Sequence, residues 1–123
     1  MSDEDVVFLS IRELGTLIRK RQISPVDLAQ QYLSRSEKLG PKYNAYVNLT
    51  SELALKQSRA AEEELASGYD RGPLHGIPYA VKDLIAVPGY PTTWGARPFR
   101  EQKFDYNATV IEKLNDAGAV LAP

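Results

Sequence analysis

Apolar side chains recur every three or four positions over residues 11–22, which is the spacing of an amphipathic helix. Ser10 and Glu13 stand three residues apart at the start of this stretch, as in a capping box, where each side chain bonds the backbone N–H of the other residue. The pattern predicts a helix that begins at about residue 11 and ends at about residue 22.

A second helix start follows at Ser24 and Pro25. A serine can accept hydrogen bonds from the first-turn amides, and proline suits the first helical position because its missing N–H is not needed there. Gly40-Pro41 predicts the end of this helix, since a glycine followed by a helix breaker is a common stop signal. The side chains expected to face inward are Val26, Ala29, Tyr32 and Leu33.

Residues 43–49 are aromatic and branched, and we interpret them as a strand or an extended link. A third helix is predicted over about 51–67, ending at Gly68. Its inward-facing side chains are expected to be Leu55, Ala61 and Leu65.

After the third helix the pattern changes from helical to extended. Residues 77–85 form a mostly apolar run typical of a buried strand, and the long passage 88–107 is irregular and begins with turn residues. A helix near 108–117 precedes a last apolar strand at 119–122, and this order favours an α/β fold with the two strands parallel. The edge of the last strand should need a partner or a cover. The side chains expected to face inward on the last helix are Val110, Ile111, Leu114 and Ala117.

Composition narrows the class of protein. The 123 residues include 15 Lys and Arg against 16 Asp and Glu, for a formal net charge of −1, and 43% are hydrophobic. This profile is typical of one soluble globular domain. It gives no electrostatic reason to expect a nucleic acid or an anionic membrane as partner.

Cysteine is absent, which excludes disulfides, a thiolate nucleophile and sulfur-ligated metal sites. Asp/Glu pairs with metal-ligand spacing are not evident, so we predict no metal and no other cofactor. The acidic start of the chain has no long apolar region, which argues against a signal peptide, and no apolar run approaches about 20 residues. These features predict a cytoplasmic protein.

One stretch carries a specific signal. Residues 72–84 are Gly-Pro-Leu-His-Gly-Ile-Pro-Tyr-Ala-Val-Lys-Asp-Leu, followed by Gly89, Thr92-Thr93 and Gly95. This passage resembles the start of the amidase-signature hydrolases, a group that includes the glutamyl-tRNA amidotransferases, fatty-acid amide hydrolases and many bacterial amidases. The resemblance covers nearly the whole chain. It implies an incomplete N-terminal part of the amidase-signature α/β/α sandwich, with several helices and few strands.

The resemblance also implies a role for Lys82. In such enzymes the matching lysine belongs to a Ser-Ser-Lys triad, where it acts as a base toward a bridging serine that relays the proton of the nucleophilic serine. A lysine can do this only while it is neutral, and burial on an apolar strand would lower its pKa. Asp83 would oppose that shift if it lay close, but neighbouring side chains on a strand face opposite ways.

The two catalytic serines of the family lie downstream of this lysine, whereas every serine of this chain precedes it. The backbone of the oxyanion hole would be missing as well. We therefore expect residues 1–123 to be a single domain that is one segment of a larger fold and is inactive alone. Within it we expect a helical part over 10–67, a strand with the catalytic lysine at 77–85 and a helix–strand unit at 108–122.

Several other side chains near the motif have two interpretations each. His75 is the only histidine and lies in a turn, where it either makes a structural hydrogen bond or has a catalytic or metal-binding role. Thr92 and Thr93 either line a substrate pocket or act as turn partners. Trp94 either forms an aromatic wall of that pocket or packs ordinarily.

Two functions remain open at this point. In the first, the chain is the N-terminal segment of an enzyme that cleaves carboxylic amide C–N bonds, and it supplies Lys82 when joined with the remainder; its partners are then an amide substrate and a complementing chain. In the second, the chain is a non-catalytic association module, or a pseudoenzyme fragment, that covers its apolar faces by forming a homo-oligomer. Neither function involves a nucleic acid or a membrane.

Overall fold

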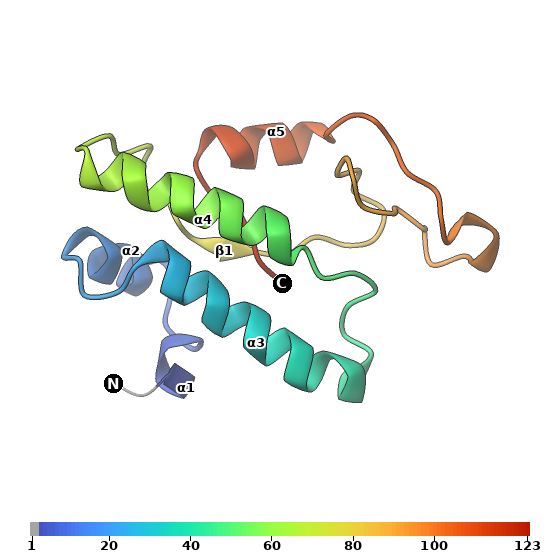
Figure 1. Ribbon diagram of the computed structural model, residues 1–123, viewed down its shortest axis with the longest axis horizontal. Coiled ribbons are helices and arrows are strands. Elements are labelled where there is room, and N and C mark those ends of the chain that lie inside the picture. Colours follow the sequence, from blue (N-terminus) through green and yellow to red (C-terminus); the bar gives the residue numbers. More distant parts are fainter. Residues whose placement is uncertain (1–2) are drawn as a thin grey trace.

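The computed structural model describes residues 3–123, and Figure 1 shows helices packed around a short two-stranded sheet. The elements in chain order are α1 (Asp3–Val6), α2 (Ile11–Arg19), α3 (Pro25–Tyr43), α4 (Ser51–Ala66), β1 (Pro78–Tyr79), a 3₁₀ helix (Arg97–Phe99), α5 (Thr109–Asp116) and β2 (Val120–Leu121).

The predicted capping box of α2 is confirmed. The Ser10 N–H donates to Oε2 of Glu13 at 2.7 Å, and the Glu13 N–H donates to Oγ of Ser10 at 3.2 Å. The helix ends at Arg19 rather than at residue 22, because Arg21 adopts a left-handed conformation with φ of 57° and reverses the chain toward α3.

The start of α3 is also as predicted, with Ser24 accepting from the Asp27 N–H at 2.9 Å and Pro25 at the first helical position. Its predicted end at Gly40-Pro41 is wrong, since α3 continues to Tyr43. A proline in the last turn removes one hydrogen bond without stopping the helix. The stop comes from Asn44, whose φ of 50° lies in the left-handed region that asparagine tolerates better than most residues.

The two interpretations of residues 43–49 are settled in favour of an extended link, since no strand forms between α3 and α4. The third predicted helix is confirmed as α4, which ends at Ala66. Gly68 follows with a φ of 90°, which is the conformation of a glycine after a helix end.

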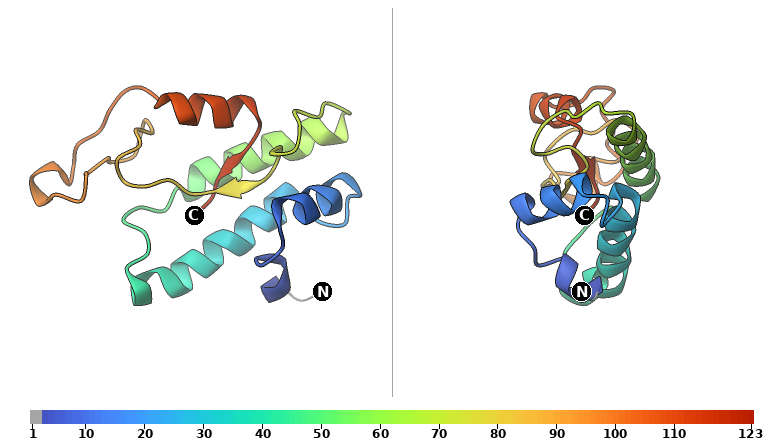
Figure 2. Two further views of the ribbon diagram at one scale, coloured as in Figure 1. Left: turned by 180° about the vertical axis from the view of Figure 1, so that it is seen from behind. Right: turned by 90° about the vertical axis from the view of Figure 1, so that its left-hand side faces the viewer.

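The two strands are parallel, with Pro78 opposite Val120 and Tyr79 opposite Leu121, as the sequence predicts. Val120 and Ala122 pack against α3 and α4, whereas Leu121 packs with Ile111 of α5 on the other side. Both views of Figure 2 show α3 and α4 together on one side of the strands and α5 on the other. The chain therefore forms part of an α/β/α sandwich.

The predicted strand at 77–85 is wrong in length, because β1 contains only two residues. The N–H groups of Val120 and Ala122 donate to the carbonyls of Ile77 and Tyr79, and beyond Tyr79 the first strand has no ladder partner. The chain then turns, and the N–H groups of Leu84 and Ile85 donate to the carbonyl of Lys82 at 2.8 and 3.1 Å. Lys82 thus lies in a turn after the strand.

The free edge of β2 is covered by side chains of the same chain. The Leu121 N–H donates to Oε1 of Gln57 at 2.8 Å, and the Leu121 carbonyl accepts from the Thr50 hydroxyl at 2.6 Å. The cover that a terminal apolar strand requires is therefore supplied by the start and middle of α4.

The helix α5 differs from its predicted orientation at one residue. Ile111 is buried as expected, but Val110 is 45% exposed. Residues 88–107 extend away from the packed helices as an irregular arm that includes the 3₁₀ helix (Figure 1). In residues 3–123, no helix combines the length and the apolar character needed to cross a bilayer.

Candidate functional site

The turn that leads into β1 is held by paired charges. Arg19 contacts the Asp70 carboxylate through Nε at 2.8 Å and Nη2 at 2.9 Å, and Nη2 also donates to the Gly72 carbonyl at 2.7 Å. The Asp70 carboxylate accepts from the Gly72 N–H at 2.9 Å. The Arg19 guanidinium, helped by this N–H, lowers the pKa of Asp70 to about 2.

His75 is the buried centre of a second group of charges in this turn. Its Nδ1 accepts from the Arg71 N–H at 3.0 Å, so the neutral ring carries its proton on Nε2. Nε2 lies 3.1 Å from Oε2 of Glu64, in a poor direction for a hydrogen bond. The same Glu64 carboxylate binds Arg71, with Nε at 2.6 Å, and Arg71 also donates to the Asp116 carbonyl at 3.1 Å.

These contacts explain how His75 titrates. Burial lowers the pKa of His75, the Arg71 guanidinium lowers it further, and the Glu64 and Asp70 carboxylates oppose the change. The hydrogen bond from Arg71 is the main cause of the lowered pKa of Glu64. The structure therefore supports the structural interpretation of His75, whose ring is packed and bonded inside the turn.

Gly118 makes this packing possible. Its φ is 75°, and a Cβ at this position would lie 2.3 Å from Cδ2 of His75 and 2.9 Å from Cδ of Arg71. The segment that enters β2 can approach the turn only because residue 118 has no side chain.

Lys82 lies after β1, at a cleft of about 220 Å³. Its side chain is exposed, which contradicts the buried strand position expected from the sequence. Within residues 3–123 the Lys82 ammonium makes no hydrogen bond or ion pair. Hydrophobic and amide side chains line the same cleft, among them Val81, Val87, Leu121 and Asn48.

Asp83 is bonded to Thr93 and is not paired with its neighbour Lys82. One carboxylate oxygen accepts from the Thr93 N–H at 2.9 Å, and the other accepts from the Thr93 hydroxyl. The Asp83 carbonyl accepts from the Trp94 N–H at 3.0 Å. Residues 92–95 are therefore attached to the turn that carries Lys82.

Of the three candidate substrate contacts, the structure brings only Thr92 to the cleft. Thr92 is buried, and its backbone is held by Gln102, whose carbonyl accepts from the Thr92 N–H at 2.7 Å. Thr93 is buried as a turn partner of Asp83. Trp94 is 52% exposed and its ring lies 4.9 Å from that of Phe99, outside the cleft.

Two side chains of this region had no signal in the sequence. Asn48 lines the cleft, and its Nδ2 donates to the Pro91 carbonyl at 3.3 Å. Burial raises the pKa of Tyr79 to about 12, so the phenol stays protonated at physiological pH. Tyr79 is therefore excluded as a base near Lys82.

No serine lines the Lys82 cleft in the part of the chain that the structure describes. Ser10 and Ser24 cap helices, and the hydroxyls of Ser36 and Ser58 donate to the carbonyls of Pro123 and Leu55. Residues 3–123 also contain no group of three or more His, Asp or Glu side chains that could hold a metal ion.

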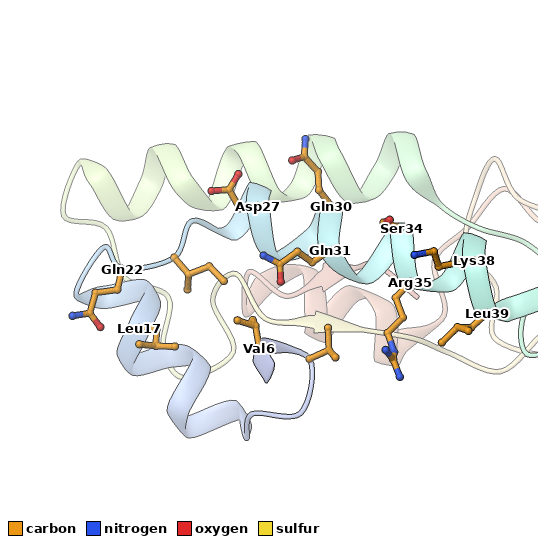
Figure 3. A pocket seen from close by; sticks show the side chains of 12 residues that line it. Val6, Leu17, Gln22, Asp27, Gln30, Gln31, Ser34, Arg35, Lys38 and Leu39 are labelled. Carbon is orange, nitrogen blue, oxygen red and sulfur yellow. The ribbon is translucent and has the colours of Figure 1, made fainter. Parts of the chain in front are cut away.

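A larger groove of about 960 Å³ runs along α3 (Figure 3). Apolar side chains such as Val6 and Leu17 line it together with the charged side chains of Asp27, Arg35 and Lys38. It shares no residue with the Lys82 cleft and brings together no pair of groups with evident chemistry.

Comparison with known proteins shows what this arrangement is part of. The model of the Amidase family matches residues 27–122. The chain belongs to the amidase family. It is 42% identical over 111 residues to the amidase-family component of the glutamyl-tRNA(Gln) amidotransferase of Methylobacillus flagellatus, covering 90% of this chain and 22% of that protein. It is 39% identical over 120 residues to the putative amidase AmiD of Mycobacterium tuberculosis, covering 97% of this chain and 25% of that protein.

Solved structures of amidases have the same fold over this part. The peptide amidase of Stenotrophomonas maltophilia superimposes with a TM-score of 0.87 at 30% identity, covering 94% of this chain and 24% of the amidase. A bacterial aryl acylamidase of the amidase-signature family gives a TM-score of 0.86 at 27% identity. The chain spans about a quarter of the length of the amidases it matches, so it contains one part of the amidase-signature α/β fold.

Proposed function

We propose that this chain supplies the base, Lys82, to an enzyme that hydrolyses carboxylic amide C–N bonds by a Ser-Ser-Lys mechanism. The observation that carries the proposal is the position of Lys82 in an amidase-family chain, at a cleft, with an ammonium that pairs with nothing in residues 3–123. An amine that is not needed for an ion pair is available to exchange a proton.

The chemistry assigns a separate task to each part of the enzyme. Lys82, when neutral, accepts a proton from a bridging serine, which takes the proton of the serine that attacks the amide carbon. The C–N bond then breaks, and the nitrogen leaves as an amine or ammonia. The serines and the oxyanion-stabilising N–H groups would come from polypeptide beyond these 123 residues, so we expect the chain alone to be inactive.

The exposed area of the chain supports a need for further polypeptide. The accessible surface is 7817 Å², compared with about 6,600 Å² for a compact monomer of 13.7 kDa. The excess exceeds the roughly 800 Å² that one partner buries in a typical stable interface. Additional polypeptide that covers the Lys82 cleft would also remove water from the amine, which favours its neutral form.

A complementation experiment tests this proposal. Residues 1–123 are mixed with the remaining part of the Methylobacillus flagellatus relative, and ammonia release from a peptide amide is measured. We expect turnover in the mixture, none from either part alone, and loss of turnover with Lys82→Ala. Lys56→Ala, which changes an exposed lysine on α4, is the matched control and should retain activity.

Two outcomes would contradict the proposal. One is robust turnover by residues 1–123 alone that is abolished by Lys82→Ala, because the missing serines would then be unnecessary. The other is complemented activity that Lys82→Ala does not change, because the base would then lie elsewhere.

The same exposed area supports the second candidate, self-association without catalysis. Large apolar side chains on the arm and the Lys82 turn remain exposed, with Leu84 at 53% and Tyr106 at 54%. A homodimer that buries them is the expected product when no complementing chain is present. Light scattering at tens of micromolar that gives the mass of a monomer would exclude this candidate.

The single-domain organisation and the cytoplasmic location remain predictions of the sequence. The three core clusters share the helices α3 and α4 or the strands between them and α5, which supports one unit. Limited proteolysis that leaves residues 10–122 intact is the expected result for one unit.

A further inference from the structure

The electrostatic surroundings of Lys82 depend on one neighbouring carboxylate. Lys82 and Asp83 are the only charged side chains that line the cleft in the described part of the chain. An opposite charge close to an amine favours its charged form. If the Asp83 carboxylate turned to Lys82, it would hold that side chain as an ammonium, which cannot accept a proton.

The structure shows that the Asp83 carboxylate is bound elsewhere. Both of its oxygens accept hydrogen bonds from Thr93, one from the backbone N–H at 2.9 Å and one from the hydroxyl. Thr93 is 8% exposed, so these bonds are shielded from water. A carboxylate that is satisfied in this way gains little by leaving its partner.

We propose that Thr93 is a positioning residue for Lys82, because it holds both oxygens of Asp83 and so keeps the nearest counter-ion away from the amine. This inference rests on the proposed function, which gives the unpaired amine its purpose. It assigns Thr93 an indirect role, since its hydroxyl is already occupied and does not need to contact a substrate.

The turn around Thr93 supports this role. Trp94 and Gly95 have φ values of 56° and 71°, and the Ala96 N–H donates to the Thr93 carbonyl at 3.0 Å, as in a type I′ turn. A bulky residue such as tryptophan is strained at positive φ. The Thr93 hydroxyl, which accepts from the Gly95 N–H at 3.2 Å, and the Asp83 carbonyl, which accepts from the Trp94 N–H, hold this turn in place.

Amine labelling of residues 1–123 tests the proposal without any catalysis. Acetic anhydride reacts with neutral amines, and the extent of acetylation at Lys82 is measured by peptide mass spectrometry, with Lys20 and Lys56 as internal references. Thr93→Val removes the hydroxyl at nearly constant volume and releases Asp83, so we expect Lys82 to be labelled about two- to fivefold more slowly, as for a new exposed ion pair. Thr93→Ser keeps the hydroxyl and should be labelled like the parent chain.

A double variant separates the charge of Asp83 from the shape of the turn. In Thr93→Val combined with Asp83→Asn no counter-ion is left, so labelling of Lys82 should return to the parent rate. Thr16→Val, which removes an exposed threonine hydroxyl on α2, is the matched control and should change nothing. Circular dichroism establishes that each variant is folded at the labelling temperature.

Several outcomes would overturn the inference. Labelling that is unchanged in Thr93→Val would show that Asp83 does not approach Lys82 when released. Labelling that stays slow in the double variant would show that the turn, and not the carboxylate, controls the amine. If Thr93→Val does not fold, Asp83→Asn alone decides, since slower labelling of Lys82 in it would contradict the proposal. An inactive complemented enzyme would count against the proposed function and leave this labelling result unaffected.

Discussion

The turn that enters β1 and the turn that leaves it are both rich in polar residues, but they treat their charges differently. Before the strand, Arg19 pairs with Asp70, and Arg71 and His75 lie against Glu64. After the strand, Asp83 is bonded to Thr93, and Lys82 pairs with no group in residues 3–123. Paired charges fix the geometry of the first turn, whereas the second turn keeps one cation available for chemistry.

The strongest test of the first turn is the close approach of Gly118. We expect Gly118→Ala to lower the free energy of unfolding by about 3–5 kcal/mol, because the new Cβ would collide with the side chains of the turn and the residue would be strained at positive φ. Urea denaturation measures this. Gly89→Ala is the matched control, since Gly89 has a φ of 86° with nothing within 4 Å of the added Cβ, and it should cost only about 1–2 kcal/mol. Equal losses in the two variants would show that the close packing is unimportant.

The next largest effect is expected at His75. His75→Ala leaves the Arg71 N–H without its acceptor and opens a buried cavity, so we expect a loss of about 2–3 kcal/mol at pH 7. The pKa of His75 is lowered in the folded chain by burial, so the unfolded chain binds the proton first as the pH falls. Stability should therefore decrease below about pH 6.5 in the parent chain. His75→Ala should lack this part of the pH dependence, and a parent chain equally stable at pH 5 and pH 7 would contradict the assignment.

A smaller effect is expected from the outer ion pair. Arg19 and Asp70 are 37% and 42% exposed, so solvent screens their attraction, and a double-mutant cycle should give a coupling of only about 0.2–1 kcal/mol. Because the pKa of Asp70 is lowered to about 2, the stability it adds is present above about pH 4 and is lost as the pH falls toward 2. Asp70→Asn should flatten the unfolding curve in that range. A coupling that persists undiminished in about 1 M salt would show that the pair is better shielded than its exposure indicates.

The smallest effect on stability is expected at Lys82 itself. Lys82 is exposed and unpaired within the described residues, so Lys82→Ala should change the free energy of unfolding by less than about 0.5 kcal/mol. Arg71→Ala, which removes bonds to Glu64 and the Asp116 carbonyl, should cost more. If the lysine variant were the less stable of the two, the distinction between a structural turn and a functional turn would fail.

The sequence alone determined the features that depend on neighbouring residues. The caps at Ser10 and Ser24 and the amidase motif around Lys82 are local, and helix caps act over one turn whatever lies beyond them. The parallel pairing of the two strands also followed, because a strand–helix–strand order has few alternatives.

Tertiary structure decided the features that depend on distant partners. A strand continues only where another strand supplies hydrogen bonds, and after Tyr79 there is none, so an apolar run that predicted a long strand became a turn with an exposed Lys82. The binding of Asp83 by Thr93 joins residues ten positions apart, and Gln57 covers the edge of β2 from 64 positions away. Hydrogen bonds over such separations are set by the folded path of the chain, which local patterns of residues do not contain.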